Sequence, residues 1–340
     1  MSLIEFTNKG IYCKQGNFYI DPWHPVDYAV TTHGHADHVK WGNKNYLCHD
    51  LTKPILTQRY GLDENVQTLS YHKQININGV KLSLHPAGHV IGSSQIRLEY
   101  KGEICVVSGD YKLANDGIST AFEPVKCHTF VSESTFGLPI YHWESQQQVF
   151  GQINEWLSTN HLKQKTSILI AYSLGKAQRL IKNLAGNYPI YVHQSIATLN
   201  EAFVEAGVDL PKTISITPLI KKEDLQKGII IVPPALVEGK WIKSLIQPAT
   251  AICSGWMMVR AGRRWRSADA GFALSDHADW PSLLNAIKAT QAEKVFVTHG
   301  YTAIFSKYLN EIGINAEEVS TKYGSEENDD DNQTKQNEIT

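Results

Sequence analysis

The sequence predicts an α/β protein in which an αββα domain is built from both ends of the chain and an α/β cap is inserted in the middle. Three observations predict it. Short strands separated by turn residues fill the first third of the chain. Strands alternate with helices in the middle, which is typical of a parallel α/β unit. The last part, beyond residue 250, returns to the first pattern.

The first third is rich in strands. Residues 28–32 form an apolar strand that runs directly into His33. Residues 80–84 alternate between apolar and polar side chains after an Asn-Gly turn. Residues 94–100 alternate again, and a tight turn joins them to the apolar run 104–107, so these two segments are expected to pair as a hairpin.

Helical spacing of apolar residues appears in the middle and near the end of the chain. The predicted helices are 146–157, 176–184, 196–206, 280–290 and 303–312. The predicted strands between them are 167–172, 190–192, 229–232, 249–253 and 295–298. The expected organisation is a first part of the main domain at 1–140, a cap at 141–250, the rest of the main domain at 251–323 and a tail at 324–340.

Composition excludes several classes of protein. The chain has 340 residues and is 42% apolar, enough to bury a sizeable core. It has neither a signal-peptide pattern nor a run of ~18 apolar residues, so we expect a cytoplasmic protein without a membrane segment. The five cysteines are scattered and form no CxxC pair, which disfavours a disulfide framework and a zinc knuckle.

Charge is unevenly distributed along the chain. The formal net charge is −2, but the tail 324–340 alone carries six acidic residues and one lysine. The rest of the chain is therefore mildly basic, and the acidic tail is expected to be disordered. The choice of partner must be argued from local clusters.

The strongest chemical signal is the HxHxDH run at residues 33–38, directly after a predicted strand. Neutral imidazole and carboxylate groups are ligands that zinc and manganese accept. Because His33 and His35 are two residues apart, they point to one side in an extended backbone. Asp37 and His38 follow where the chain leaves the strand, so they can face a second metal ion.

Three further ligand-type residues lie near strand ends, beside glycine: His89, Asp110 and His299. Strand ends are where a sheet displays side chains into a cleft. Together with the HxHxDH run they predict a metal centre. The other histidines lack this setting and are expected to be bystanders: His24, His49, His72, His85, His128, His142, His161 and His193.

This combination resembles the metallo-β-lactamase superfamily. The resemblance implies two divalent metal ions, zinc or manganese. It also implies the ligands: His33, His35 and His89 for the first ion, Asp37, His38 and His299 for the second, and Asp110 as the bridge. Asp21 resembles the early aspartate of the family that orients a metal-bound histidine. Its alternative role is that of a turn residue before Pro22.

Further matches resemble the β-CASP nucleases within that superfamily. Glu133 and His277 match the signature acid and histidine of this group, and the family inserts a cap between them. The segments 173–179 and 254–258 look most like the bacterial exonucleases associated with ATP-dependent DNA ligases, which implies DNA repair. His299 instead favours RNA as the substrate, because family members that act on RNA have histidine there and those that cut DNA usually have valine.

The resemblance implies phosphodiester hydrolysis by a hydroxide that two metal ions share, with Asp37 and Asp110 holding the ions. His277 would act as general acid or phosphate clamp, with Glu133 setting its tautomer. Basic and small polar residues of the cap and the segment after it are candidate nucleic-acid contacts. They are Ser173, Lys176, Arg179, Arg260, Arg263, Arg264 and Arg266.

Four functions follow from this pattern. The first is a DNA exonuclease in repair, with 5′-to-3′ polarity favoured, in a pathway with an ATP-dependent DNA ligase. The second is an RNA-processing nuclease, supported by His299. The third is a non-catalytic nucleic-acid-binding scaffold, against which the intact ligand set argues. The fourth is a small-molecule hydrolase of the same fold, against which the cap and the arginine segment argue.

Overall fold

The computed structural model describes residues 3–186, 188–237, 239–259 and 268–321. The chain divides into two compact units, each described below by itself. The first is built from the chain up to His142 and from His277 through the last described strand, and the second extends from Trp143 to Asp276. The acidic tail predicted at 324–340 lies outside the described residues.

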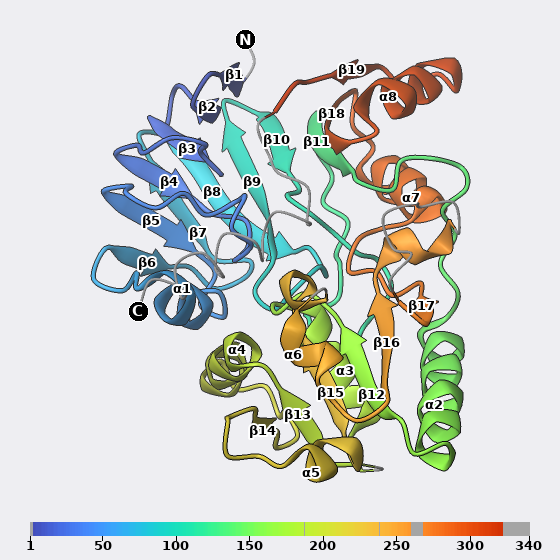
Figure 1. Cartoon of the computed structure of the whole chain (residues 1–340). Helices are drawn as coiled ribbons and strands as arrows, with labels where there is room; N and C mark the ends of the chain where they lie inside the picture. Colours follow the sequence, from blue (N-terminus) through green and yellow to red (C-terminus); the bar gives the residue numbers. More distant parts are fainter. Residues whose placement is uncertain (1–2, 187, 238, 260–267, 322–340) are drawn as a thin grey trace. The chain divides into compact units, whose positions relative to one another are not determined.

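The first unit contains two sheets (Figure 1). Its first sheet has six strands in sequence order, antiparallel from β1 to β3 and parallel from β3 to β6. The strands are β1 (Glu5–Thr7), β2 (Gly10–Cys13), β3 (Phe18–Ile20), β4 (Tyr28–Val30), β5 (Asn45–Cys48) and β6 (Val66–Thr68).

The second sheet joins the two ends of the chain, because β18 pairs in parallel with β11. Its order is β19-β18-β11-β10-β9-β8-β7. The strands are β7 (Gln74–Ile77), β8 (Val80–Pro86), β9 (Ser94–Tyr100), β10 (Glu103–Val107), β11 (Thr129–Ser134), β18 (Lys294–Gly300) and β19 (Ala316–Glu318). The predicted β9–β10 hairpin is confirmed, and Lys101 and Gly102 at its turn both have positive φ, as a tight hairpin turn requires.

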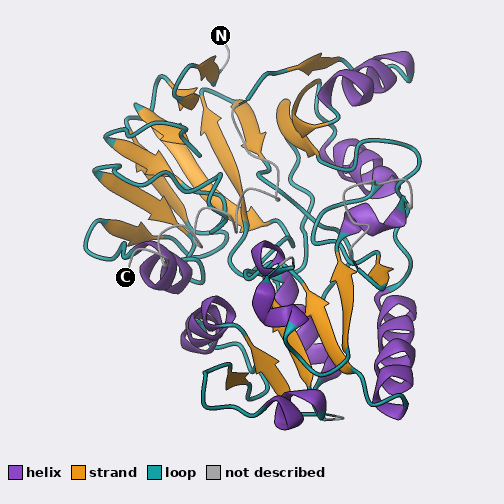
Figure 2. Ribbon diagram, viewed as in Figure 1, coloured by secondary structure: helices purple, strands orange, loops and turns teal. Residues whose placement is uncertain are grey.

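Apolar side chains fill the space between the two sheets, with Ile11 and Val30 from the first sheet and Leu84 and Ile96 from the second in one core cluster. Helix α1 (Lys53–Tyr60) covers the outer face of the first sheet, where Leu56 packs with Tyr46. Helices α7 (Trp280–Thr290) and α8 (Thr302–Glu311) cover the outer face of the second sheet (Figure 2). The predicted αββα sandwich is thereby confirmed.

The second unit is a layered α/β unit, and every strand pair described in it is parallel. Its sheet has the order β14-β13-β15-β12-β16-β17. The strands are β12 (Thr166–Ile170), β13 (Ile190–Val192), β14 (Ile214–Ser215), β15 (Ile229–Val232), β16 (Pro248–Cys253) and β17 (Ala270–Phe272).

Helices lie on both faces of this sheet, because its all-apolar central strands need cover on each side. One face packs against α2 (Gln146–Leu162), α3 (Lys176–Leu184) and α4 (Gln194–Glu205). The other packs against α5 (Lys222–Gln226) and α6 (Lys240–Lys243), and the short 3₁₀ helices η1 (Pro234–Leu236) and η2 (Gly255–Met258) complete the described helices.

The boundary of this unit differs from the expected cap limit at residue 250. Strand β16 pairs with β12, and β17 pairs with β16, so both belong to the third sheet rather than to the αββα sandwich. The second unit therefore runs to Asp276. Pairing partners far apart in sequence leave no trace in local composition, so this extent of the sheet does not follow from the sequence alone. In the described part of the chain, no helix is both long and apolar enough to cross a bilayer.

Candidate metal centre

Three histidine side chains from two loops converge inside the first unit. His33 and His35 lie in the loop after β4, and His89 lies in the loop between β8 and β9. Nδ1 of His35 lies 3.2 Å from Nε2 of His33 and 3.1 Å from Nε2 of His89. Zinc ligands at ~2.0–2.1 Å in a tetrahedron stand roughly 3.3–3.4 Å apart. The three buried nitrogens are therefore spaced much as ligands of a single ion would be.

Asp110 follows shortly after β10 and lies close to both His33 and His38. Its Oδ2 atom lies 3.5 Å from Nε2 of His33 and 3.5 Å from Nε2 of His38. The same oxygen lies 3.9 Å from Nε2 of His89. His33, His35, His89 and Asp110 form a buried set whose ligand atoms all lie within 4.8 Å of one another. This carboxylate oxygen therefore lies between His33 and His38, and its role as a bridge between two ions stays a prediction.

The remaining predicted ligands lie on the His38 side of Asp110. Oδ2 of Asp37 lies 3.6 Å from Nε2 of His38. The ring centroids of His38 and His299 are 6.3 Å apart. His299, near the end of β18, has a φ of 55°, a left-handed backbone that is uncommon for a residue with a side chain. The structure thus brings all seven predicted ligands into one cluster, and their assignment to two ions stays a prediction.

Asp21 lies where the sequence analysis expected an orienting carboxylate. It follows β3, is buried, and its Oδ2 lies 2.7 Å from Nδ1 of His38. Its Oδ1 accepts a hydrogen bond from the backbone N–H of Thr32, and its Oδ2 accepts one from the Thr32 hydroxyl. A carboxylate that accepts the Nδ1 proton of His38 leaves Nε2 of that ring for Asp110 or an ion. Sequence reasoning missed Thr32, whose role depends on a partner eleven positions earlier.

Glu133 and His277 form a buried pair beside this cluster. Nδ1 of His277 lies 2.9 Å and 3.1 Å from the two carboxylate oxygens of Glu133. The backbone N–H of Tyr111 donates to Oε1 of Glu133 at 2.7 Å. The register of β11 shifts between Ser132 and Ser134, and such a bulge re-aims the side chain between them. The His277 ring centroid is 4.5 Å from that of His89, so the pair adjoins the candidate ligands.

The protonation states of the cluster suit a cation. Burial, and then the neighbouring His38 and His89, hold the pKa of His33 well below its usual value. Burial raises the pKa of Asp110, but His38 outweighs this and the net shift is strongly downward. Burial likewise lowers the pKa of His38, yet the carboxylates of Asp37, Asp110 and Asp21 raise it well above its usual value.

Of these groups, the neutral His33 and the ionised Asp110 have the protonation states that metal binding requires. The proton that the carboxylates hold on His38 marks a place where positive charge is favoured. The buried donor set therefore fits divalent metal, and a pair of ions stays a prediction.

Glycine is required where the backbone approaches this cluster most closely. Gly109 precedes Asp110 with a φ of +57°, and a Cβ there would lie 2.7 Å from the Thr32 side chain. Gly300 follows His299 with a φ of +87°, and a Cβ there would lie 2.3 Å from the carbonyl oxygen of Ser134. Real Cβ atoms are essentially never this close to another heavy atom, so no larger residue fits without a shift of the cluster.

The predicted substrate contacts in the second unit are buried. Ser173 is 1% exposed, Lys176 0% and Arg179 4%. Nζ of Lys176 lies 3.4 Å from Oδ2 of Asp276, and Nη1 of Arg179 lies 3.3 Å from Oδ1 of that carboxylate. Contact between these side chains and nucleic acid stays a prediction. The candidates Arg260, Arg263, Arg264 and Arg266 lie outside the described residues.

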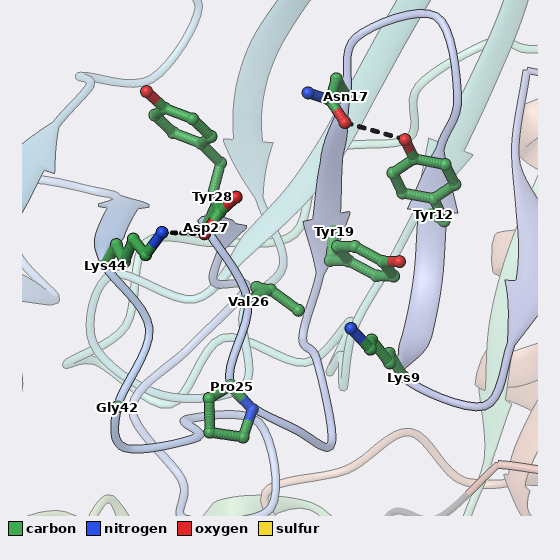
Figure 3. Close-up of a pocket in the computed structure, with 10 residues that line it drawn as sticks. All are labelled: Lys9, Tyr12, Asn17, Tyr19, Pro25, Val26, Asp27, Tyr28, Gly42 and Lys44. Carbon is green, nitrogen blue, oxygen red and sulfur yellow. Dashed lines mark hydrogen bonds and ion pairs between the residues drawn. The ribbon is translucent and has the colours of Figure 1, made fainter.

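The first unit also contains a surface pocket of about 330 Å³, shown in Figure 3. Its lining residues are Lys9, Tyr12, Asn17, Tyr19, Pro25, Val26, Asp27, Tyr28, Gly42 and Lys44. Four of its polar side chains pair with one another, since the Tyr12 hydroxyl donates to Asn17 and Lys44 lies 2.7 Å from Asp27. None of its lining residues belongs to the histidine cluster, so the chemistry is expected at the cluster.

Comparison with known proteins gives relatives but no match to a protein-family model. A probable DNA ligase of Opitutus terrae is 28% identical over 321 residues, which cover 92% of this chain and 30% of that protein. An RNase J-like protein of Methanocaldococcus jannaschii is 24% identical over 349 residues, covering 81% of this chain and 82% of that protein. The endoribonuclease YSH1 of Yarrowia lipolytica is 30% identical over 120 residues, covering 34% of this chain and 14% of that protein.

The chain thus spans less than a third of the ligase and of the YSH1 relative. These relatives combine a protein named as a ligase with proteins named as RNA nucleases. Together with the αββα sandwich and the buried histidine–aspartate cluster, they confirm the resemblance found in the sequence, which is to the β-CASP nucleases of the metallo-β-lactamase superfamily.

Proposed function

We propose that this protein is a two-metal phosphodiesterase that degrades DNA as an exonuclease in DNA repair, with 5′-to-3′ polarity favoured. The observation that carries the choice of DNA is the relative named as a probable DNA ligase, which matches 92% of this chain. The match covers only 30% of that relative, so ligation itself is not transferred to this chain. A partnership with a separate ATP-dependent ligase and a cytoplasmic location belong to the same proposal.

The candidate ligands divide into two sets around Asp110. His33, His35 and His89 would hold one divalent ion, and Asp37, His38 and His299 would hold the other. Zinc and manganese both suit this mixture of imidazole and carboxylate. A pair of such ions lowers the pKa of a bound water and neutralises the charge of a phosphodiester.

The residues of the chain itself have separate tasks in this proposal. Asp110 keeps the two ligand sets at a fixed separation, since its Oδ2 lies 3.5 Å from both His33 and His38. Asp21 holds the His38 ring through Nδ1. Glu133 accepts a hydrogen bond from Nδ1–H of His277. In the protonated ring, Nε2–H would then give its proton to the leaving oxygen or donate a hydrogen bond to a phosphate oxygen.

Nucleic-acid binding is proposed for cationic side chains of the second unit. Arg260, Arg263, Arg264 and Arg266, with Trp265 among them, suit phosphate contacts and base stacking. Ser173, Lys176 and Arg179 belong to the same proposal. Lys176 and Arg179 both lie close to Asp276, the last described residue of the second unit.

The alternative substrate is RNA. Two observations favour it: relatives named as an endoribonuclease and as RNase J-like, and the histidine at position 299. The RNase J-like relative is matched over most of its own length, at 82%. An RNA-processing nuclease would use the same residues for the same hydrolysis.

The deciding experiment is paired digestion of single-stranded DNA and RNA of one sequence, each labelled at either the 5′ or the 3′ end. Metal-stripped protein is resupplied with zinc or manganese, and Asp37→Ala serves as the inactive control and His24→Ala as the surface control. Stepwise shortening of DNA by the wild type supports the proposal, and the labelled end that is lost first gives the polarity.

Cleavage of RNA alone would replace the DNA proposal with the RNA alternative. DNA binding without any metal-dependent cleavage would leave a scaffold function, and hydrolysis of thioesters or β-lactams alone would leave a small-molecule hydrolase.

A further inference from the structure

Away from the candidate metal centre, the first unit carries a second group of ligand-type side chains: His72, His85 and Glu123. They come from three segments, namely the turn before β7, strand β8 and the segment between β10 and β11. Their ligand atoms all lie within 4.8 Å of one another. We propose that these three residues bind one divalent transition-metal ion of the zinc class at the surface of this unit.

The spacing of the three side chains is that of a metal site. Oε2 of Glu123 lies 3.4 Å from Nε2 of His72, and Oε1 of Glu123 lies 3.8 Å from Nδ1 of His85. The two rings are 5.1 Å apart and nearly perpendicular, at 81°. Ligands at ~2.0–2.2 Å around a tetrahedral ion are separated by roughly 3.3–3.5 Å. A small inward movement of the carboxylate completes three corners of that tetrahedron, and water can take the fourth.

His85 has the environment of a metal-binding imidazole. Its Nε2 lies 3.1 Å from the hydroxyl of Ser83, which can accept the Nε2 proton. Its Nδ1 is buried, and no described residue gives it a hydrogen bond. In the tautomer that donates to Ser83, Nδ1 presents a buried lone pair to the Glu123 carboxylate, which is unfavourable unless a positive charge lies between them. Burial, and then the nearby His72, lower the pKa of His85; Glu123 raises it, and the net shift is downward.

The backbone positions of the other two ligands are anchored to the same strand. The N–H of His72 donates to the carbonyl of Leu84 at 2.9 Å, and His72 has a φ of 64°. The N–H of Glu123 donates to the carbonyl of Pro86 at 3.3 Å. The Gln95 side chain donates to the carbonyl of Glu123 at 2.7 Å. Binding an ion therefore orders two side chains but requires no rearrangement of the backbone, which keeps its entropic cost small.

A hydrogen-bonded ion pair is the competing explanation. His72 and Glu123 are half exposed, at 54% and 47%, and an exposed pair of this kind contributes little to stability. It would account for the 3.4 Å contact, but Glu123 lies 3.8 Å from the buried Nδ1 of His85, which is too far for a hydrogen bond in the observed arrangement. The two explanations differ in one measurable respect, because only the metal site binds zinc.

An ion bound by His72, His85 and Glu123 would cross-link three segments of the first unit and so stabilise their packing. A Cβ on Gly88 would lie 2.2 Å from the carbonyl oxygen of Lys112 and 3.1 Å from the N–H nitrogen of Phe122. The segment that carries Glu123 therefore packs directly against the loop that carries His89. Tying Glu123 to His85 and His72 would hold that segment on β8, without sharing any ligand with the candidate metal centre.

The test is the zinc stoichiometry of the full-length chain. Metal-stripped protein is dialysed against zinc, and bound zinc is measured by elemental mass spectrometry for the wild type, for His72→Ala/Glu123→Gln and for His24→Ala. The double variant keeps a single ligand, His85, and changes two half-exposed side chains, so folding is expected to survive and is checked by circular dichroism. His24 is an exposed histidine outside the group.

The double variant should bind one equivalent of zinc less than the wild type and the His24→Ala control, and zinc should raise its Tm by a smaller amount. Equal zinc content in the double variant and the wild type would overturn the proposal. The result is a difference of one equivalent, so it does not depend on nuclease activity or on how many ions the candidate metal centre holds.

Discussion

Oδ2 of Asp21 lies 2.7 Å from Nδ1 of His38 and also accepts the hydroxyl proton of Thr32. The carboxylate thus links the end of β3 to the loop after β4. That loop carries Thr32 and the candidate ligands His33, His35, Asp37 and His38. Its effect on the cluster is indirect, through the orientation and proton of one imidazole.

Replacing Asp21 with asparagine should weaken metal binding ~10–100-fold, because the amide carries no charge to hold the Nδ1 proton of His38. Competition between the protein and a chelator for zinc measures the loss. Asp27→Asn is the matched control, since Asp27 is exposed and pairs with Lys44. An unchanged affinity in Asp21→Asn would show that His38 does not need this carboxylate.

Glu133 and His277 should behave as one catalytic unit. Glu133→Gln keeps an oxygen for the Tyr111 N–H but loses the charge that holds the His277 tautomer. We expect kcat to fall ~10²–10⁴-fold in Glu133→Gln and in His277→Ala, with little change in KM. The double variant should lose about as much as either single variant, because the two residues act together.

Steady-state kinetics of the two single variants and the double variant measure this, with Glu99→Gln on β9 as a control for loss of a surface carboxylate. Multiplicative losses, or a change confined to KM, would contradict a shared role in the chemical step.

Gly300 should tolerate alanine much less than Gly102 does. The two glycines have nearly the same φ, +87° and +86°, so the backbone strain of a side chain is matched. A Cβ on Gly300 would lie 2.3 Å from the Ser134 carbonyl oxygen, whereas nothing lies within 4 Å of one on Gly102. Gly300→Ala should therefore lose more stability than Gly102→Ala, by ~1–3 kcal/mol.

Urea unfolding of both variants gives that difference. Because Gly300 follows His299, Gly300→Ala should also bind metal more weakly. Equal losses of stability in the two variants would mean that the backbone at Gly300 can shift enough to accommodate a Cβ, which would contradict the prediction.

His49 should make stability depend on pH. Its ring is buried and stacks on Tyr71 with centroids 3.5 Å apart, and burial lowers its pKa from 6.5 to about 4. The unfolded state therefore binds a proton at higher pH than the folded state does. The contribution of this group is complete above pH 6.5 and is lost as pH falls towards 4, by on the order of 3 kcal/mol.

Urea unfolding across this pH range, compared between the wild type and His49→Gln, isolates the effect from other titrating groups. The variant should lose less stability on acidification than the wild type. Parallel curves would contradict the lowered pKa.

Local sequence patterns predicted those helices and strands that have glycine or proline at their ends. The helix Lys176–Leu184 and the strand Ile229–Val232 match the structure to the residue, because glycine or proline lies beside each. The helix from Gln146 was predicted too short, since it continues to Leu162 through a polar last turn. Helix α1 was not predicted, because Lys53–Tyr60 buries only Ile55 and Leu56 and shows no apolar periodicity.

The candidate metal centre and the residues around it were also predictable from the sequence only in part. The HxHxDH run is local, so its chemistry follows from spacing alone. The pairing of Glu133 with His277 joins residues 144 positions apart and was expected only from the resemblance. The burial of Lys176 and Arg179 depends on Asp276, and the group of His72, His85 and Glu123 depends on three separate segments. Neither arrangement produces a periodic pattern or a characteristic residue spacing in the sequence.

The most direct test of the account is a metal titration of single-turnover cleavage. Metal-stripped wild type and Asp110→Asn are each titrated with manganese and with zinc, and the cleavage of end-labelled single-stranded DNA is followed. We expect no cleavage without metal, recovery of the wild type on metal addition, and no recovery of Asp110→Asn at the same concentrations. Cleavage by the metal-free wild type, or full activity of Asp110→Asn, would contradict a catalytic metal pair bridged by Asp110.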